Sequence, residues 1–119
     1  MKRLTFATAI VALLAATAMP AMADRPEGPG INQTIVDAGS RDIYTAVFIA
    51  GRVAEVAVDG DGDTDLDLFV FDENGNLIAS DTAPGDNPVV RWVPEWTGEF
   101  TIVVKNYGSV YNRYTIRAD

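Results

Sequence analysis

The apolar residues of this chain fall into short runs with a period of two, separated by Gly, Asn, Asp and Pro. This alternation is typical of β-strands with one face in a core, because successive side chains of a strand point to opposite sides. Phe100, Ile102 and Val104 share one face of such a run, and we expect that face to be buried. We predict strands over residues 31–36, 43–49, 53–58, 66–71, 77–79, 89–93, 100–105 and 113–117.

The arrangement of these runs predicts the fold class. About eight short strands without a helical period indicate an all-β fold, an antiparallel, jelly-roll-like β-sandwich. Asn74-Gly75 lies between two of the runs and is typical of a tight hairpin, because both residues accept a positive φ. Leu66, Leu68 and Val70 form a second row that we expect in the core.

The N-terminus has the three parts of a secretory signal. Lys2 and Arg3 are followed by an apolar run over 4–19 and by the small-residue site Ala21-Met22-Ala23. The run is shorter than the roughly 20 residues that a membrane-spanning helix needs, so an uncleaved anchor is the weaker alternative. We predict a cleavable signal peptide over 1–23, a flexible lead-in over 24–30 and one domain over 31–119. The mature chain is then secreted or periplasmic, without membrane insertion.

Charge excludes some partners. All 17 acidic residues follow the signal, whereas two of the nine basic residues lie inside it, so the mature chain carries 7 − 17 = −10. Such a chain repels nucleic acid and anionic lipid. Cysteine is absent, so no disulfide can stabilise this small domain, and a structural cation or a partner subunit becomes a reasonable substitute.

The composition also argues against an enzyme. The chain has no His and no Cys, which removes the commonest general base, the thiol nucleophile and the usual zinc ligands. No serine stands in a GxSxG context. We therefore expect a non-catalytic protein. Two alternatives stay open: a structural or assembly subunit of the cell envelope, and a small hydrolase that uses a pair of carboxylates.

The densest chemical feature is an acidic run over 59–67, in which every second residue is Asp. Carboxylates at this spacing can lie on one side of an extended chain, and Ca²⁺ prefers such oxygen ligands. We predict a calcium site at Asp61, Asp63, Asp65 and Asp67. The loop that holds Asp81 and Asp86 could add ligands if the fold brings it close. The alternative is a solvated acidic loop without a metal.

Aromatic residues form the other candidate set: Trp92, Trp96, Tyr107, Tyr111 and Tyr114. Strand alternation places Trp92 opposite to Arg91 and Val93, so we expect it in the core. Trp96 follows Pro94 in a turn, and we predict that it contacts a partner at the surface.

The segment over 61–81 (DGDTDLDLFVFDENGNLIASD) resembles the bacterial pre-peptidase C-terminal domain, as do 44–51 (YTAVFIAG) and 94–106 (PEWTGEFTIVVKN). The resemblance implies a jelly-roll sandwich, usually appended to secreted proteases, and a cation site at the matching Asp63, Asp65 and Asp67, since some relatives bind calcium. The similar collagen-binding modules contact extracellular polymers. Here the module directly follows a signal peptide. We therefore expect a secreted or periplasmic binding or accessory module, stabilised by calcium, that contacts a protein or an extracellular polymer.

Overall fold

The computed structural model describes residues 30–119, so the predicted signal peptide and nearly all of the lead-in lie outside the described residues. Within this range the chain forms eight strands and no helix, hence none that could cross a membrane. The strands are β1 (Gly30–Val36), β2 (Arg41–Phe48), β3 (Ala54–Asp59), β4 (Leu66–Phe71), β5 (Leu77–Asp81), β6 (Val89–Trp92), β7 (Gly98–Asn106) and β8 (Asn112–Ala118).

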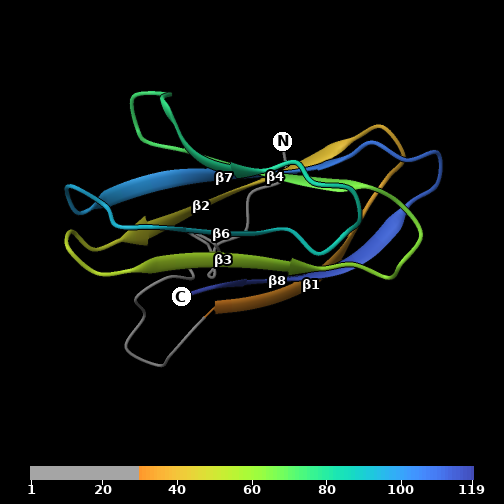
Figure 1. Cartoon of the computed structure of the whole chain (residues 1–119), viewed down its shortest axis with the longest axis horizontal. Coiled ribbons are helices and arrows are strands. Elements are labelled where there is room, and N and C mark those ends of the chain that lie inside the picture. Colours follow the sequence, from red (N-terminus) through yellow and green to blue (C-terminus); the bar gives the residue numbers. More distant parts are fainter. Residues whose placement is uncertain (1–29) are drawn as a thin grey trace.

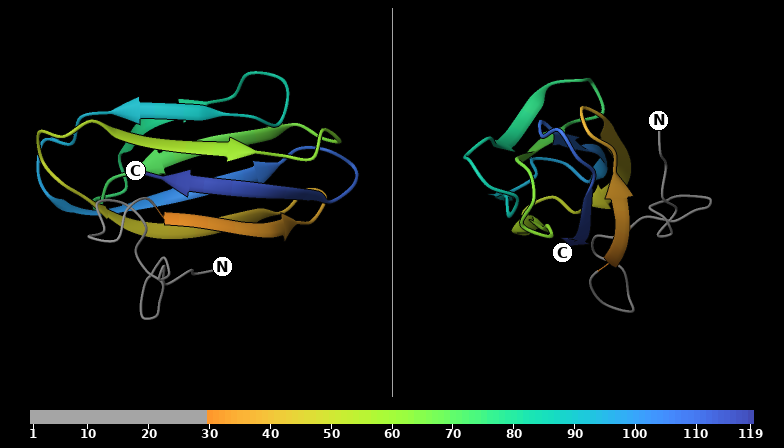
Figure 2. Two further views of the ribbon diagram at one scale, coloured as in Figure 1. Left: turned by 90° about the horizontal axis from the view of Figure 1, so that it is seen from below. Right: turned by 90° about the vertical axis from the view of Figure 1, so that its right-hand side faces the viewer.

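The strands form two four-stranded antiparallel sheets, in the orders β1-β8-β3-β6 and β2-β7-β4-β5 (Figure 1). Successive strands alternate between the sheets for most of the chain, which is the jelly-roll arrangement of two facing sheets. Figure 2 (left) shows the first sheet, with β8 between β1 and β3. The prediction of an all-β jelly-roll sandwich is confirmed.

The predicted strands agree with the observed ones to within one or two residues at most ends. The hairpin between β4 and β5 turns at Asn74-Gly75, and Gly75 has a φ of 83°. Asp72 holds this turn: its carboxylate accepts the backbone N–H groups of Asn74 and Asn76, both at 2.9 Å. These hydrogen bonds lower the pKa of Asp72 below its usual range, because they favour the charged form.

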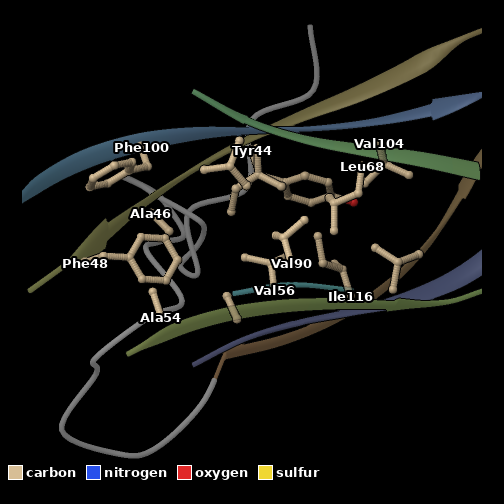
Figure 3. Packing of buried hydrophobic residues seen from close by; sticks show 14 of the residues in the cluster. Tyr44, Ala46, Phe48, Ala54, Val56, Leu68, Val90, Phe100, Val104 and Ile116 are labelled. Carbon is tan, nitrogen blue, oxygen red and sulfur yellow. The ribbon is translucent and has the colours of Figure 1, made fainter. Parts of the chain in front are cut away.

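The core lies between the two sheets (Figure 3). Leu68 and Ile102, predicted to face inward, are both fully buried. The rows to which they belong are buried as well, as the alternation predicts. Figure 3 shows side chains of one sheet (Tyr44, Leu68, Val104) facing those of the other (Val56, Val90, Ile116).

Polar groups are also buried in this core. Tyr114 is 1% exposed and donates its hydroxyl hydrogen to Asp42 Oδ2 at 2.6 Å, and its hydroxyl is hydrogen-bonded to that of Tyr44. Burial is the main reason why the pKa values of both tyrosines lie well above the usual range, and the nearby Asp42 carboxylate contributes. The pair thus stays neutral inside the sandwich.

Candidate functional site

The acidic run lies in the connection between β3 and β4, and Asp61 marks its turn. Asp61 is exposed, and both of its carboxylate oxygens accept backbone N–H groups: Oδ1 from Asp63 at 3.2 Å and Oδ2 from Arg113 at 2.9 Å. Asp63 is exposed too. Asp61 therefore fixes the start of the loop against β8 through its hydrogen bonds.

A second carboxylate, that of Asp86, ties the same loop to the connection between β5 and β6. Asp86 is 5% exposed, and its Oδ2 accepts Gly62 N–H at 2.6 Å and Asn112 Nδ2–H at 2.9 Å. A Cβ on Gly60 would overlap this carboxylate, so Gly60 leaves the space that the contact needs. The fold does bring the 81–88 loop close to the acidic run, but Asp86 is engaged by N–H donors.

Asp65 and Asp67 have a different environment. Asp67 is 7% exposed, and Oδ1 of each residue is buried without a hydrogen-bond partner within the described chain. The pKa of Asp67 is raised above its usual range, first by burial and then by the negative charges of Asp65 and Asp81. The two side chains are also close enough to share a hydrogen bond when one of them is protonated. Two negatively charged side chains are therefore close together, and no hydrogen bond of the described residues reaches their buried Oδ1 atoms.

The lysine across from this pair is directed elsewhere. Lys105 is the register partner of Asp67 in β7, yet its ammonium donates to the carbonyl of Gly39 at 2.9 Å. The same ammonium lies 5.4 Å from the centre of the Tyr107 ring. No ion pair joins Lys105 to Asp67 in the part of the chain that the structure describes.

The structure thus brings together two of the four predicted metal ligands, Asp65 and Asp67. Across residues 30–119, no group of three or more acidic side chains is arranged to hold a metal ion. Calcium binding stays a prediction, and its best-placed ligands are the two carboxylates with unpartnered buried oxygens.

The second candidate site is a pocket at the end of the sandwich where β6 leads into β7, and we call it the tryptophan pocket. Its cavity volume is about 200 Å³. The lining residues are Ile78, Trp92, Val93, Pro94, Glu95, Trp96 and Phe100. Trp92 is 9% exposed and Trp96 is 39% exposed, so the predicted core and surface positions of the two tryptophans are both confirmed.

The floor of the tryptophan pocket is a packed aromatic cluster. The Trp92 ring lies 4.7 Å from the Phe48 ring and 5.6 Å from the Phe100 ring, between centroids. Such edge-on and tilted contacts hold ring positions beyond what burial alone provides. Trp92 Nε1–H is buried without an acceptor among the described residues. The floor is therefore rigid and carries one unsatisfied donor.

The rim of the pocket is held by hydrogen bonds between two turns. Ala50 N–H donates to Thr97 Oγ1 at 2.9 Å, and Gly51 N–H donates to the Pro94 carbonyl at 3.0 Å. These bonds tie the Trp96 turn to the turn between β2 and β3. Trp96 is thus exposed on a fixed turn, which suits a contact with a partner.

Carboxylates flank the rim. Glu95 lines the pocket and is exposed. A Cβ added to Gly98 would lie 2.5 Å from Glu73 Oε1 and 3.1 Å from Trp96 Cδ1, so Glu73 and Trp96 both pack over Gly98. The neighbouring cation Arg91 is paired with Glu55 at 2.6 Å. Two carboxylates, those of Glu95 and Glu73, therefore lie beside the pocket.

A shallow groove of about 400 Å³ crosses the outer face of the second sheet. It is lined by Arg41, Phe69, Phe71, Val103, Lys105 and Tyr107. Phe69 and Phe71 are half-buried on this face. Tyr107 and Tyr111 are exposed, whereas Tyr114 belongs to the core.

Sequence reasoning missed four buried polar residues with structural roles: Asp42, Asp72, Asn106 and Asn112. A signal was present for Asp42, because it occupies the same alternating positions as Tyr44, Ala46 and Phe48 and therefore shares their inward face. The tryptophan pocket itself had no such signal. Trp92 lies in one sheet and Ile78 in the other, and a local sequence pattern does not show which residues of two sheets meet.

No protein-family model and no curated protein matches the sequence. Solved structures share the fold. One is the pre-peptidase C-terminal domain of a collagenase from Bacillus anthracis, at 14% identity and a TM-score of 0.59, covering 75% of this chain and 87% of that one. Another is a periplasmic inhibitor of g-type lysozyme from Aeromonas hydrophila, at 14% identity and a TM-score of 0.61, covering 83% and 93%.

These matches place the chain in an architectural class. Its resemblance to the pre-peptidase C-terminal domain is confirmed as a shared fold. The same architecture in a lysozyme inhibitor shows that the fold is compatible with different roles.

Proposed function

We propose that this protein is an exported, non-catalytic binding module that holds a partner protein through the tryptophan pocket. The observation that carries the proposal is the convergence of Trp92 and Trp96 on one pocket with a rigid floor and a fixed rim. Pre-organised, partly exposed aromatic side chains are the residues that most often dominate protein interfaces.

Two further points support this role. The chain lacks His and Cys, and the tryptophan pocket contains one carboxylate rather than a catalytic pair. One solved structure with this fold is described as a periplasmic inhibitor of a lysozyme, so the architecture can bind a protein in the compartment that the predicted signal peptide indicates. An extracellular polymer is the alternative ligand.

The experiment is capture of partners from the host's envelope and medium with the exported chain as bait. Wild-type protein and Trp96→Ala should melt at nearly the same temperature, because Trp96 is largely outside the core. Trp96→Ala should lose most of the partner, whereas Tyr111→Ala, which removes another exposed aromatic ring, should retain it. Equal capture by all three would overturn the role of the pocket. Intact-mass analysis of the same preparation tests export, which predicts a chain that begins at Asp24 or within a few residues of it.

We also propose that Ca²⁺ stabilises the domain by neutralising Asp65 and Asp67. The supporting observation is that each has a buried carboxylate oxygen without a partner within the described chain. A ligand that binds only the folded state at about 100 times its dissociation constant adds roughly 2.7 kcal/mol, or on the order of 10 °C for a small domain.

The calcium proposal is tested by melting the protein in chelator, in Ca²⁺ and in Mg²⁺. Coordination predicts a preference for Ca²⁺, because Mg²⁺ requires tighter octahedral geometry. Asp65→Asn should abolish most of the response. Glu99→Gln removes an exposed carboxylate at the other end of β7 from Lys105, the register partner of Asp67, and should preserve the response. Equal stabilisation by both ions that disappears in about 0.5 M salt would indicate general screening instead.

A further inference from the structure

We infer that the tryptophan pocket takes a cationic side chain, arginine or lysine, from the partner protein. This inference rests on the proposed function and identifies the chemistry of the contact. It begins with size: about 200 Å³ is below the roughly 300–1,000 Å³ of sites that enclose a small molecule, and it suits one long side chain.

The walls match the stem of such a side chain. Ile78, Val93 and Pro94 are apolar, and Trp92, Trp96 and Phe100 provide aromatic surfaces. Arginine and lysine bury their methylene groups along apolar surface while their charged ends keep polar contacts. Tryptophan is also the aromatic side chain whose face attracts a cation most strongly.

The charge of the rim selects the cation. Glu95 is the one charged residue that lines the pocket, and Glu73 packs beside Trp96. Arg91, the cation next to Trp92 in the sequence, forms an ion pair with Glu55 and not with Glu95 or Glu73. Both carboxylates are exposed, so they repel an anionic side chain and attract a cationic one that enters the pocket.

Two more observations agree with a polypeptide occupant. The Trp96 turn that carries the exposed ring is held in place by the hydrogen bonds from Ala50 and Gly51, so an inserted side chain meets a fixed aromatic surface. The acidic excess of the chain would also accelerate encounter with a basic partner surface.

The chain offers a direct measurement, because Trp92 and Trp96 are its only two tryptophans and both line this pocket. Their fluorescence can be titrated on the full exported protein with a short arginine-containing peptide that lacks aromatic residues. A peptide with citrulline in place of arginine is the matched control, since it is similar in shape but neutral. We expect the arginine peptide to shift the emission and to bind about tenfold more tightly than the citrulline peptide.

Variants separate charge from packing. Glu95→Gln should weaken arginine binding about fivefold and reduce its salt dependence, whereas Asp37→Asn makes the same charge change far away and should have no effect. Equal binding of the two peptides, or no response at about 10 mM, would overturn the inference, as would a stronger response to a neutral oligosaccharide. If the peptides fail while Trp96→Ala still loses its captured partner, the binding module stands and the cationic occupant does not.

Discussion

Tyr114 of β8 donates its hydroxyl hydrogen to the carboxylate of Asp42 in β2 at 2.6 Å, and so joins the two sheets through a polar contact inside the core. A hydrogen bond to a charged group is stronger than one between neutral groups, and a buried carboxylate that loses a donor is destabilised. This contact therefore contributes both to stability and to the relative placement of the sheets.

We expect Tyr114→Phe to lower the free energy of unfolding by about 1–3 kcal/mol, since Asp42 loses this donor while the ring is retained. Urea denaturation would measure the change. Tyr107→Phe removes an exposed hydroxyl and should leave the midpoint nearly unaltered. If the two variants unfold alike, the contact contributes no net stability.

Alkaline pH should also weaken the fold. Burial raises the pKa values of Tyr44 and Tyr114 in the folded state, whereas in the unfolded chain each titrates near its usual value of about 10. Above that pH the unfolded state has lost protons that the folded state retains, so the free energy of unfolding falls as pH rises. Melting curves between about pH 8 and pH 11 should show the loss, and Tyr44→Phe should reduce it. A melting midpoint that stays constant across this range would contradict the role of burial.

Asp67 should affect stability in the opposite sense to an ordinary paired carboxylate. The pKa of Asp67 is raised in the folded state, so folding disfavours its ionised form. The stability that is present at low pH is therefore lost as the pH rises through the folded-state pKa. In chelator we expect Asp67→Asn to raise the melting midpoint by a few degrees, on the order of 2–5 °C. In saturating Ca²⁺ the ranking should reverse, because only the wild type can bind. A variant that is less stable than the wild type in chelator would contradict the electrostatic account.

The two central core rows provide a test of the register. Leu68→Ala and Ile102→Ala should each lower the free energy of unfolding by about 2–5 kcal/mol through lost burial and a residual cavity. Val53→Ala, at a side chain that is 67% exposed, should cost far less. If Leu68→Ala does not change the free energy of unfolding in a denaturant titration, the side chain of Leu68 does not face the core.

The fold was predictable because the alternation is strong where the core is. Three apolar side chains share one face of a strand, those of Leu66, Leu68 and Val70, and such a face is stable only when it is buried. Gly, Asn and Pro at the turns predicted where the strands end. The short run at 77–79 extends to Asp81 because Ser80 and Asp81 pair with β4, a cross-strand contact that local propensity does not reveal.

The candidate sites were predictable only in part, for a physical reason. Equal spacing made the aspartates of the 59–67 run look equivalent, but the backbone N–H of Arg113 in β8 engages Asp61. Asp65 directly precedes β4 and Asp67 lies in it, and the buried Oδ1 of each has no such donor among the described residues. Trp96 was identified as exposed from its turn. Its association with Ile78 and Glu73 depends on how the two sheets pack, which no local pattern specifies.

The position of β8 has a consequence for the order of assembly. β8 pairs with β1 in one direction across the sheet and with β3 in the other, and Asp119 exchanges backbone hydrogen bonds with Glu55 at 2.9 and 3.0 Å. Residues 30–36 therefore pair only with residues more than seventy positions later in the chain. The entropy of closing so long a loop is lost before the strand contacts that offset it can form. A chain that emerges N-terminus first, from a ribosome or through a membrane pore, keeps β1 without its partner until 112–118 appears. Completion of the fold is thus timed by the last strand.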